Sequence, residues 1–289
     1  MWIVMAILSA FFAGLTTILS KCGLKHCNSN VATAIRTSVV LLFSWLIVFI
    51  TGAYQGISKI SATSLLFLLL SGVATGISWL CYFKALAVGE ASKVAVVDKS
   101  SIIFTILFAL IVFPEERTLW WVKLLCLTAI AIGTFLMIDI KHAEKNNKIM
   151  WLIFAFLSAL FAAATSILAK IGIKNVDSSL ATAIRTCVVL VMAWLIVLCK
   201  KEIKYVKEIK GKEILFLVLS GLATGASWLC YYYAIQKGQV SVVVPIDKLS
   251  ILITVLFSLL VFKEKLSIKA WIGLFLLTAG TIFMAIFAS

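Results

Sequence analysis

Long runs of apolar residues, separated by short polar stretches, dominate the pattern of the chain. Five such runs precede a polar stretch at residues 141–149, and five follow it. They lie at residues 2–21, 31–52, 64–86, 93–113, 119–139, 150–171, 179–199, 213–235, 241–262 and 268–287. A helix needs about 20 apolar residues to cross the hydrocarbon core of a bilayer. The pattern therefore predicts an all-α integral membrane protein with ten transmembrane helices.

The second half of the chain repeats the first at a distance of 149 residues. Residues 32–37 read Ala-Thr-Ala-Ile-Arg-Thr, and residues 181–186 have the same sequence. Residues 71–85 and 220–234 are identical at 11 of 15 positions. Such a match between distant segments indicates an internal duplication.

Five helices per copy determine how the copies are related in the membrane. An odd number of crossings brings the chain out on the opposite side, so the second copy begins there. We expect two inverted five-helix repeats, at residues 1–140 and 150–289, joined by a linker at residues 141–149. This arrangement is typical of alternating-access transporters.

The composition agrees with a membrane protein and excludes a water-soluble domain. The chain is 63% hydrophobic and 13% charged, with a mean hydropathy of +1.14, whereas soluble domains are about 45–50% apolar and about 25% charged. A net charge of +14 would suggest nucleic-acid binding in a soluble protein. Here the lysines cluster in loops between apolar runs, so we expect a lipid bilayer as partner and no nucleic acid.

The distribution of basic residues predicts an orientation. The loops after the first, third, fifth, seventh and ninth runs carry sixteen Lys residues, against six Lys and Arg on the other face. The positive-inside rule makes the richer face cytoplasmic and puts both termini outside. We expect a multi-pass protein of a bacterial or archaeal plasma membrane, whose first apolar run is a retained helix and not a cleaved signal peptide.

Two motifs after the fourth and ninth runs resemble the EamA family of the drug/metabolite transporter superfamily. Residues 262–267 read Phe-Lys-Glu-Lys-Leu-Ser, and Trp-Ile-Gly and Thr-Ala-Gly follow at residues 271–273 and 278–280. Residues 113–118 keep Glu115 but have Pro114 where the family often has Gly. The resemblance implies transport through a central cavity, with the fifth and tenth helices outside it. Many relatives have cytoplasmic termini, so the orientation stays open.

Charged residues inside apolar runs are costly and usually have a function. Those that stand out here recur in the second half: Arg36 and Arg185, Asp98 and Asp247, Lys99 and Lys248. One interpretation is structural or gating ion pairs, Arg36 with Asp98 and Arg185 with Asp247. The two lysines would then remain as net positive groups that favour an anionic part of a substrate.

A polar and aromatic stripe also occurs twice. Helical spacing puts Thr75, Ser78, Trp79 and Tyr82 on one face, and the repeat puts Thr224, Ser227, Trp228 and Tyr231 on another. Hydroxyl groups beside aromatic walls suit a small amphipathic molecule or an organic cation. The alternative is an aromatic belt at the membrane interface.

These features predict a secondary transporter of a small polar or zwitterionic metabolite, with amino acids first. Export of drugs or organic cations is an alternative to this function, and a structural or assembly role in the membrane is a second alternative. The sequence contains no HExxH or GxSxG motif, and its two histidines, His26 and His142, lie in predicted loops. We therefore expect no enzyme, cofactor or metal site, and a functional monomer.

Overall fold

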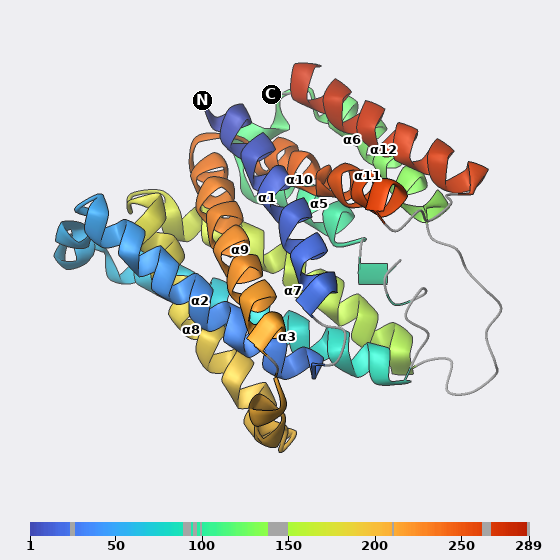
Figure 1. Cartoon of the computed structure of the whole chain (residues 1–289). Coiled ribbons are helices and arrows are strands. Elements are labelled where there is room, and N and C mark those ends of the chain that lie inside the picture. The colour runs from blue at the N-terminus through green and yellow to red at the C-terminus, as the bar shows by residue number, and fades with distance from the viewer. Residues whose placement is uncertain are drawn as a thin grey trace.

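The computed structural model describes residues 1–23, 27–88, 94, 97–98, 100–137, 150–209, 211–261 and 267–287. Helices are the regular elements of this part of the chain, and it contains no strand (Figure 1). The helices of the first half are α1 (Trp2–Gly23), α2 (Ser29–Ile50), α3 (Ala62–Val88), α5 (Ser101–Val112) and α6 (Trp120–Leu136).

The helices of the second half follow the same order. They are α7 (Met150–Ile173), α8 (Ser178–Cys199), α9 (Gly211–Lys237), α10 (Val240–Lys248), α11 (Ser250–Val261) and α12 (Ile268–Phe287). Three short 3-10 helices connect longer ones: η1 (Ala53–Lys59), η2 (Pro114–Arg117) and η3 (Ile203–Glu208). Most helix boundaries lie within a few residues of the predicted runs.

The run predicted as one helix at residues 241–262 is divided. It consists of α10 and α11, which are separated by Leu249. The Leu249 N–H bonds to the Ile246 carbonyl at 3.0 Å, which is the tighter 3-10 pattern. Pro245 inside α10 has no N–H to donate, so it weakens the regular pattern just before the break.

The helices have the length and surface of membrane spans. Within the described residues, eight helical segments are long and apolar enough to cross a bilayer, and α5 and α6 are shorter apolar helices. Large apolar side chains face outward on these helices, such as Leu42 with 72% and Phe275 with 71% of its surface exposed. Lipid is the solvent that such a surface requires.

The two halves interleave, because α1 packs along α9 and α7 packs along α3 (Figure 1). Hydroxyl pairs join α1 to α9, and along these pairs the residue numbers rise in α1 while they fall in α9. The pairs are Ser9 with Ser227 at 3.3 Å, Thr16 with Thr224 at 3.3 Å, and Ser20 with Ser220 at 2.7 Å. The same pairing recurs between α3 and α7: Thr75 with Thr165 at 3.3 Å and Ser78 with Ser158 at 3.3 Å. Both helix pairs are therefore antiparallel.

Small residues allow two further helix pairs to approach closely. A Cβ atom added at Gly221 of α9 would lie 2.7 Å from the Val39 Cβ atom of α2. A Cβ atom added at Gly72 of α3 would lie 2.7 Å from the Val188 Cβ atom of α8. Each Gly lies in a G-x-x-x-G segment of its helix, which is a common close-packing pattern in membranes.

Two pairs of equivalent helices, α2 with α8 and α6 with α12, pack in opposite directions. The start of α2 packs on the end of α8, where Val31 and Val197 share a core cluster, and Val48 near the end of α2 shares another with Leu180 at the start of α8. The pair α6 and α12 lies at one side of the bundle (Figure 1). A Cβ atom at Gly133 of α6 would lie 2.6 Å from the Gly273 carbonyl oxygen, and one at Gly280 would lie 3.3 Å from the Cys126 carbonyl oxygen.

Candidate functional site

A central cavity of about 290 Å³ lies between the two halves, and its wall includes residues of α1, α3, α7, α8, α9 and α10. Many of the residues that the sequence singled out meet there. The cavity is lined by Thr75, Ser78, Trp79, Arg185, Ser227, Trp228, Tyr231, Asp247 and Lys248. Trp79 and Trp228 thus belong to a cavity wall.

The hydroxyl groups of the predicted stripe also hold the halves together. Ser78 donates to the Ser158 carbonyl at 3.0 Å, and Ser227 donates to the Ser9 carbonyl at 3.1 Å. Since both serines are buried at helix contacts, the same residues that line the cavity also fix the distance between α3 and α7 and between α1 and α9. The stripe has a packing role in addition to its place in the wall.

Arg185 has the most enclosed environment of the charged residues in the cavity wall. It is 1% exposed, and its Nη2 donates to the Thr75 hydroxyl at 2.9 Å. Its guanidinium carbon lies 4.3 Å from the centre of the Tyr232 ring and 5.3 Å from that of Trp228. The Nε contact with the Ser71 hydroxyl, at 3.4 Å, is long. Two aromatic rings and a threonine therefore hold the plane of the guanidinium.

The predicted ion pairs are wrong for this conformation. Arg36 donates to the Ser20 hydroxyl at 2.8 Å, and it does not reach Asp98. Asp98 instead accepts from Ser158 at 3.0 Å. The reason is the interleaving: Arg36 of α2 faces α1 and α9, whereas Asp98 faces α7.

Arg185 and Asp247 are likewise not paired with each other. Arg185 bonds to residues of α3, and Asp247 accepts from the Ser9 hydroxyl of α1 at 2.6 Å. Among the described residues, one salt bridge has its nitrogen and oxygen atoms within 4.0 Å of each other, and it joins Lys123 to Glu116. Neither Asp in question is therefore neutralised by direct contact with an arginine.

The other predicted site residues lie outside this wall. Tyr82 packs beside a small cluster that contains Ala85, and Thr224 pairs with Thr16 of α1. Arg36 and Asp98 also do not line this cavity. Lys99 falls outside the described residues.

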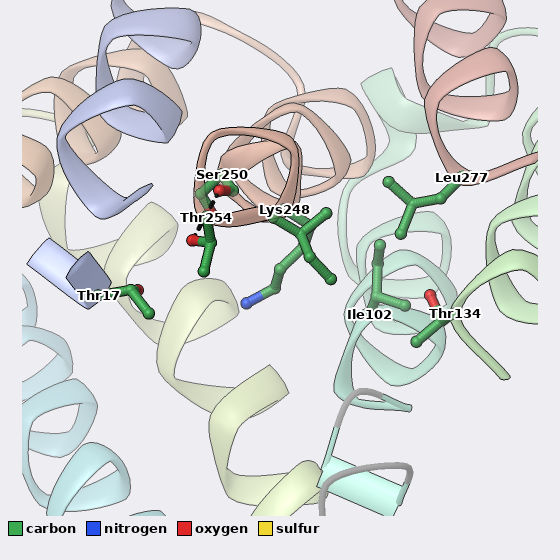
Figure 2. Close-up of a pocket in the computed structure, with 8 residues that line it drawn as sticks. Thr17, Ile102, Thr134, Lys248, Ser250, Thr254 and Leu277 are labelled. Carbon is green, nitrogen blue, oxygen red and sulfur yellow. Dashed lines mark hydrogen bonds between the residues drawn. The ribbon is translucent and has the colours of Figure 1, made fainter. Parts of the chain in front are cut away.

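A second cavity of about 250 Å³ begins on the other side of Lys248. Figure 2 shows the Lys248 amino group pointing away from Leu277, toward the side on which Thr17 lies. Ile102 and Thr254 also line this second cavity. Lys248 therefore borders both cavities.

Sequence reasoning did not single out Tyr232, although it lines the central cavity. Tyr232 follows Trp228 by one helical turn, so the spacing could have indicated it. The repeat also marks it, because the equivalent residue of the first half is Phe83. Its neighbour Tyr231 bonds through its hydroxyl to Ser166 at 2.9 Å. The sequence signal for Tyr232 was therefore a position at which the two repeats differ, whereas the predicted site residues lie at positions at which the repeats are identical.

A buried glutamate of the first half holds the start of α10 in the second half. Glu116 is fully buried, and its carboxylate accepts from the backbone N–H groups of Val240 and Ser241, the latter at 2.9 Å. Lys123, also fully buried, lies 3.9 Å from that carboxylate and donates to Gln239 at 2.6 Å. A carboxylate at a helix N-terminus satisfies free donors and is favoured by the helix dipole.

This anchor involves two residues that the sequence did not single out as a pair. Glu115 is exposed, as a place in a solvated loop requires, whereas the next residue, Glu116, is buried. Lys123 was expected to serve membrane topology, but it is buried against Glu116. Because Asp247 and Lys248 lie at the other end of α10, the anchor also determines where these two residues sit.

Comparison with known proteins agrees with this architecture. The model of the EamA-like transporter family matches residues 1–139 and 149–286. An uncharacterized transporter encoded in the cobO 3′ region of a Sinorhizobium species is 44% identical over 137 residues, which are 47% of this chain and 97% of the relative. That relative is therefore about as long as one repeat.

Two further matches are more distant. An uncharacterized protein of Methanocaldococcus jannaschii is 35% identical over 75 residues, covering 26% of this chain and 55% of the relative. A solved crystal structure superposes with a TM-score of 0.75 at 16% identity, over 99% of this chain and 97% of that one, and thus supports the fold. With apolar membrane helices throughout and the family match in both halves, the chain is a multi-pass membrane transporter that belongs to the EamA-like transporter family.

Proposed function

We propose that this transporter moves a small polar or zwitterionic metabolite, of the amino-acid type, by alternating access. The observation that carries the proposal is the central cavity, which both halves line and which holds a carboxylate, Asp247, beside a cation, Lys248. Both charges of a zwitterion find an opposite charge in such a wall. The volume of about 290 Å³ is near the lower end of the range of about 300–1,000 Å³ for small-molecule sites. The size thus favours a small metabolite over a large drug.

The proposed architecture is ten transmembrane helices in two inverted repeats, at residues 1–140 and 150–289, with a linker at residues 141–149. Several observations support it. Equivalent helices pack antiparallel in the pairs α2 with α8 and α6 with α12. The family model matches each half separately, and one relative has the length of a single half. The division between α10 and α11 beside the cavity is also a common feature of such transporters.

The proposed substrate contacts come from both repeats. The hydroxyl and aromatic groups of α3 and α9 would surround the substrate, and Lys248 would offer a positive charge. By sequence equivalence, Lys99 is assigned the same role in the first repeat. Arg36 and Asp98 would instead stabilise helix contacts, through Ser20 and Ser158. Because one chain supplies the whole cavity, we assign function to the monomer.

Export of organic cations is the second candidate, since aromatic rings in the wall could bind a cation by cation–π contact. One observation weighs against it. Arg185 already occupies positions over the Tyr232 and Trp228 rings. A positively charged substrate would have to displace this guanidinium or approach against its charge. The observed wall thus favours the zwitterion.

Counterflow into liposomes tests the proposal. Purified protein is reconstituted and preloaded with single amino acids, and uptake of the same labelled amino acid is measured. We expect uptake of at least one amino acid, with a loss of tenfold or more in Asp247→Asn and Lys248→Met. Phe275→Leu on the exposed face of α12 is the matched control and should transport normally.

Two other outcomes would contradict the proposal. Uptake of tetraphenylphosphonium or ethidium, without any amino acid, would establish the organic-cation alternative. Failure of every amino acid, sugar phosphate and organic cation in well-folded protein would favour a structural or assembly role.

A further inference from the structure

The side chain of Arg185 has hydrogen-bonding capacity that the protein does not use. Its Nη2 and Nε have partners on α3, but its Nη1 has none. The residue is 1% exposed and lines the central cavity. A buried donor without an acceptor loses its hydration without compensation, so a site that contains one favours a ligand that supplies the acceptor.

The charges near Arg185 point to an anionic acceptor. Among the described residues, no carboxylate lies within salt-bridge distance of Arg185, and Asp247 of the cavity wall bonds to Ser9. The described part of the wall therefore carries two cations, Arg185 and Lys248, against one carboxylate. An uncompensated guanidinium in a low-dielectric wall is stabilised when an anion enters.

We infer that Arg185 binds the carboxylate of the substrate, and that its counterpart Arg36 does not. This inference rests on the proposed function and adds the residue that recognises the substrate. The planar guanidinium presents N–H groups in a geometry that matches a carboxylate. Tyr232 and Trp228 lie close to the guanidinium carbon, and Nη1 is the nitrogen of this group that has no acceptor among the described residues.

The structure places a carboxylate-binding arginine in the cavity wall from one repeat and not from the other. Arg36 occupies the equivalent position in the first repeat, but it donates through Nη1 to Ser20 and does not line the central cavity. The same atom that is unused in Arg185 is thus bonded in Arg36. A carboxylate in the cavity therefore meets one of the two arginines.

The first test uses simple carboxylates, so that it does not depend on the transported molecule. Thermal unfolding of detergent-purified protein is measured with sodium propionate, with propionamide and with sodium chloride at equal ionic strength. Propionate should raise the melting temperature more than propionamide or chloride. Arg185→Lys and Arg185→Gln should lose this difference, and Arg36→Lys and Arg36→Gln should keep it.

The second test uses each transported amino acid from the counterflow screen, together with its carboxamide. In Arg185→Lys, which keeps the positive charge, the affinity for the acid should fall tenfold or more, and that for the amide should fall less than threefold. The inference is overturned if the acid and the amide lose affinity equally, because that result indicates a packing role. It is also overturned if Arg36→Lys changes the ratio of acid to amide.

Two results separate this inference from the proposed function. If no amino acid is transported but propionate stabilises the wild type through Arg185, the transport proposal fails and the carboxylate site stands. If amino acids are transported and the Arg185 variants keep the acid preference, the transport proposal stands and the Arg185 site fails. Inorganic phosphate that stabilises the wild type more than propionate would overturn the choice of a carboxylate.

Discussion

Arg36 and Arg185 occupy the same position in the same six-residue sequence, yet they have different environments. Arg185 lies between two aromatic rings and bonds to α3 of the other half. Arg36 bonds to Ser20 of its own half. A repeated sequence therefore does not guarantee two equivalent sites.

Two non-equivalent residues account for the difference. Ser20 accepts from Arg36 and pairs with Ser220 at 2.7 Å, whereas its equivalent in the second half is Ala169, which offers no hydroxyl group. Arg185 can therefore extend to Thr75 and Ser71 of α3. Beside Arg185 lies Tyr232, where the first repeat has Phe83. Single residues thus decide which arginine reaches the cavity wall.

The largest effect is expected at the anchor of α10, which also distinguishes the two repeats. Glu116 is equivalent in sequence to Lys265, so the second repeat cannot supply the same carboxylate. Glu116→Gln leaves the buried Lys123 without its partner charge, which should lower the free energy of unfolding by about 3–5 kcal/mol. Chemical unfolding in detergent measures the change.

Exposed Glu115 offers the matched control for this experiment, and Glu115→Gln should change stability by less than about 0.5 kcal/mol. The double variant Glu116→Gln with Lys123→Met should regain part of the loss, since it removes the unpaired charge. Equal effects of the Glu115 and Glu116 variants would contradict the anchor.

A smaller effect is expected for the aromatic ring over Arg185. A desolvated cation–π contact contributes about 2 kcal/mol, so Tyr232→Leu should weaken binding of transported amino acids by up to about thirtyfold. The equivalent change Phe83→Leu should have little effect, because the cation over that ring is Lys200, which does not line the central cavity. Isothermal titration or counterflow KM values would measure the affinity of both variants. Similar losses of affinity in Tyr232→Leu and Phe83→Leu would contradict a specific role of the ring over Arg185.

The smallest effect is expected at Ser20, which tests the cause of the asymmetry. Ser20→Ala removes one acceptor of Arg36 and should cost about 1 kcal/mol of stability. It also makes the first repeat resemble the second, so Arg36 should turn toward Ser220 and Thr224 of α9. In the propionate assay, the double variant Ser20→Ala with Arg185→Gln should then recover part of the stabilisation lost in Arg185→Gln. No recovery would show that Ser20 does not hold Arg36 away from the wall.

Much of the architecture was predictable from the sequence. The length of the apolar runs predicted most helix boundaries, and helical spacing put Thr75, Ser78 and Trp79 on one face of their helix, which lines the cavity together with Ser227 and Trp228 of α9. These features depend on local periodicity. The break at Leu249 was not predicted, because the apolar run continues through it and Pro245 also suits a first helical turn.

The partners of the charged residues could not be predicted in the same way. An ion pair of Arg36 with Asp98 was expected, but the position of a residue along its helix does not specify which other helix lies beside it. The interleaving of the halves put α9 next to α2, and α7 next to Asp98. Likewise, two adjacent glutamates look equivalent in sequence, and it is the turn of η2 after Pro114 that buries Glu116 and exposes Glu115.

The anchor of α10 also has a mechanical consequence. Glu116 belongs to the first half by sequence but is bonded to the first residues of α10 in the second. If the halves rock against each other, these bonds make the start of α10 travel with the first half. Gly238, between α9 and α10, also lies close to the first half, because an added Cβ atom there would lie 2.5 Å from the Trp2 ring. Asp247 and Lys248, at the other end of α10, would move together with this helix.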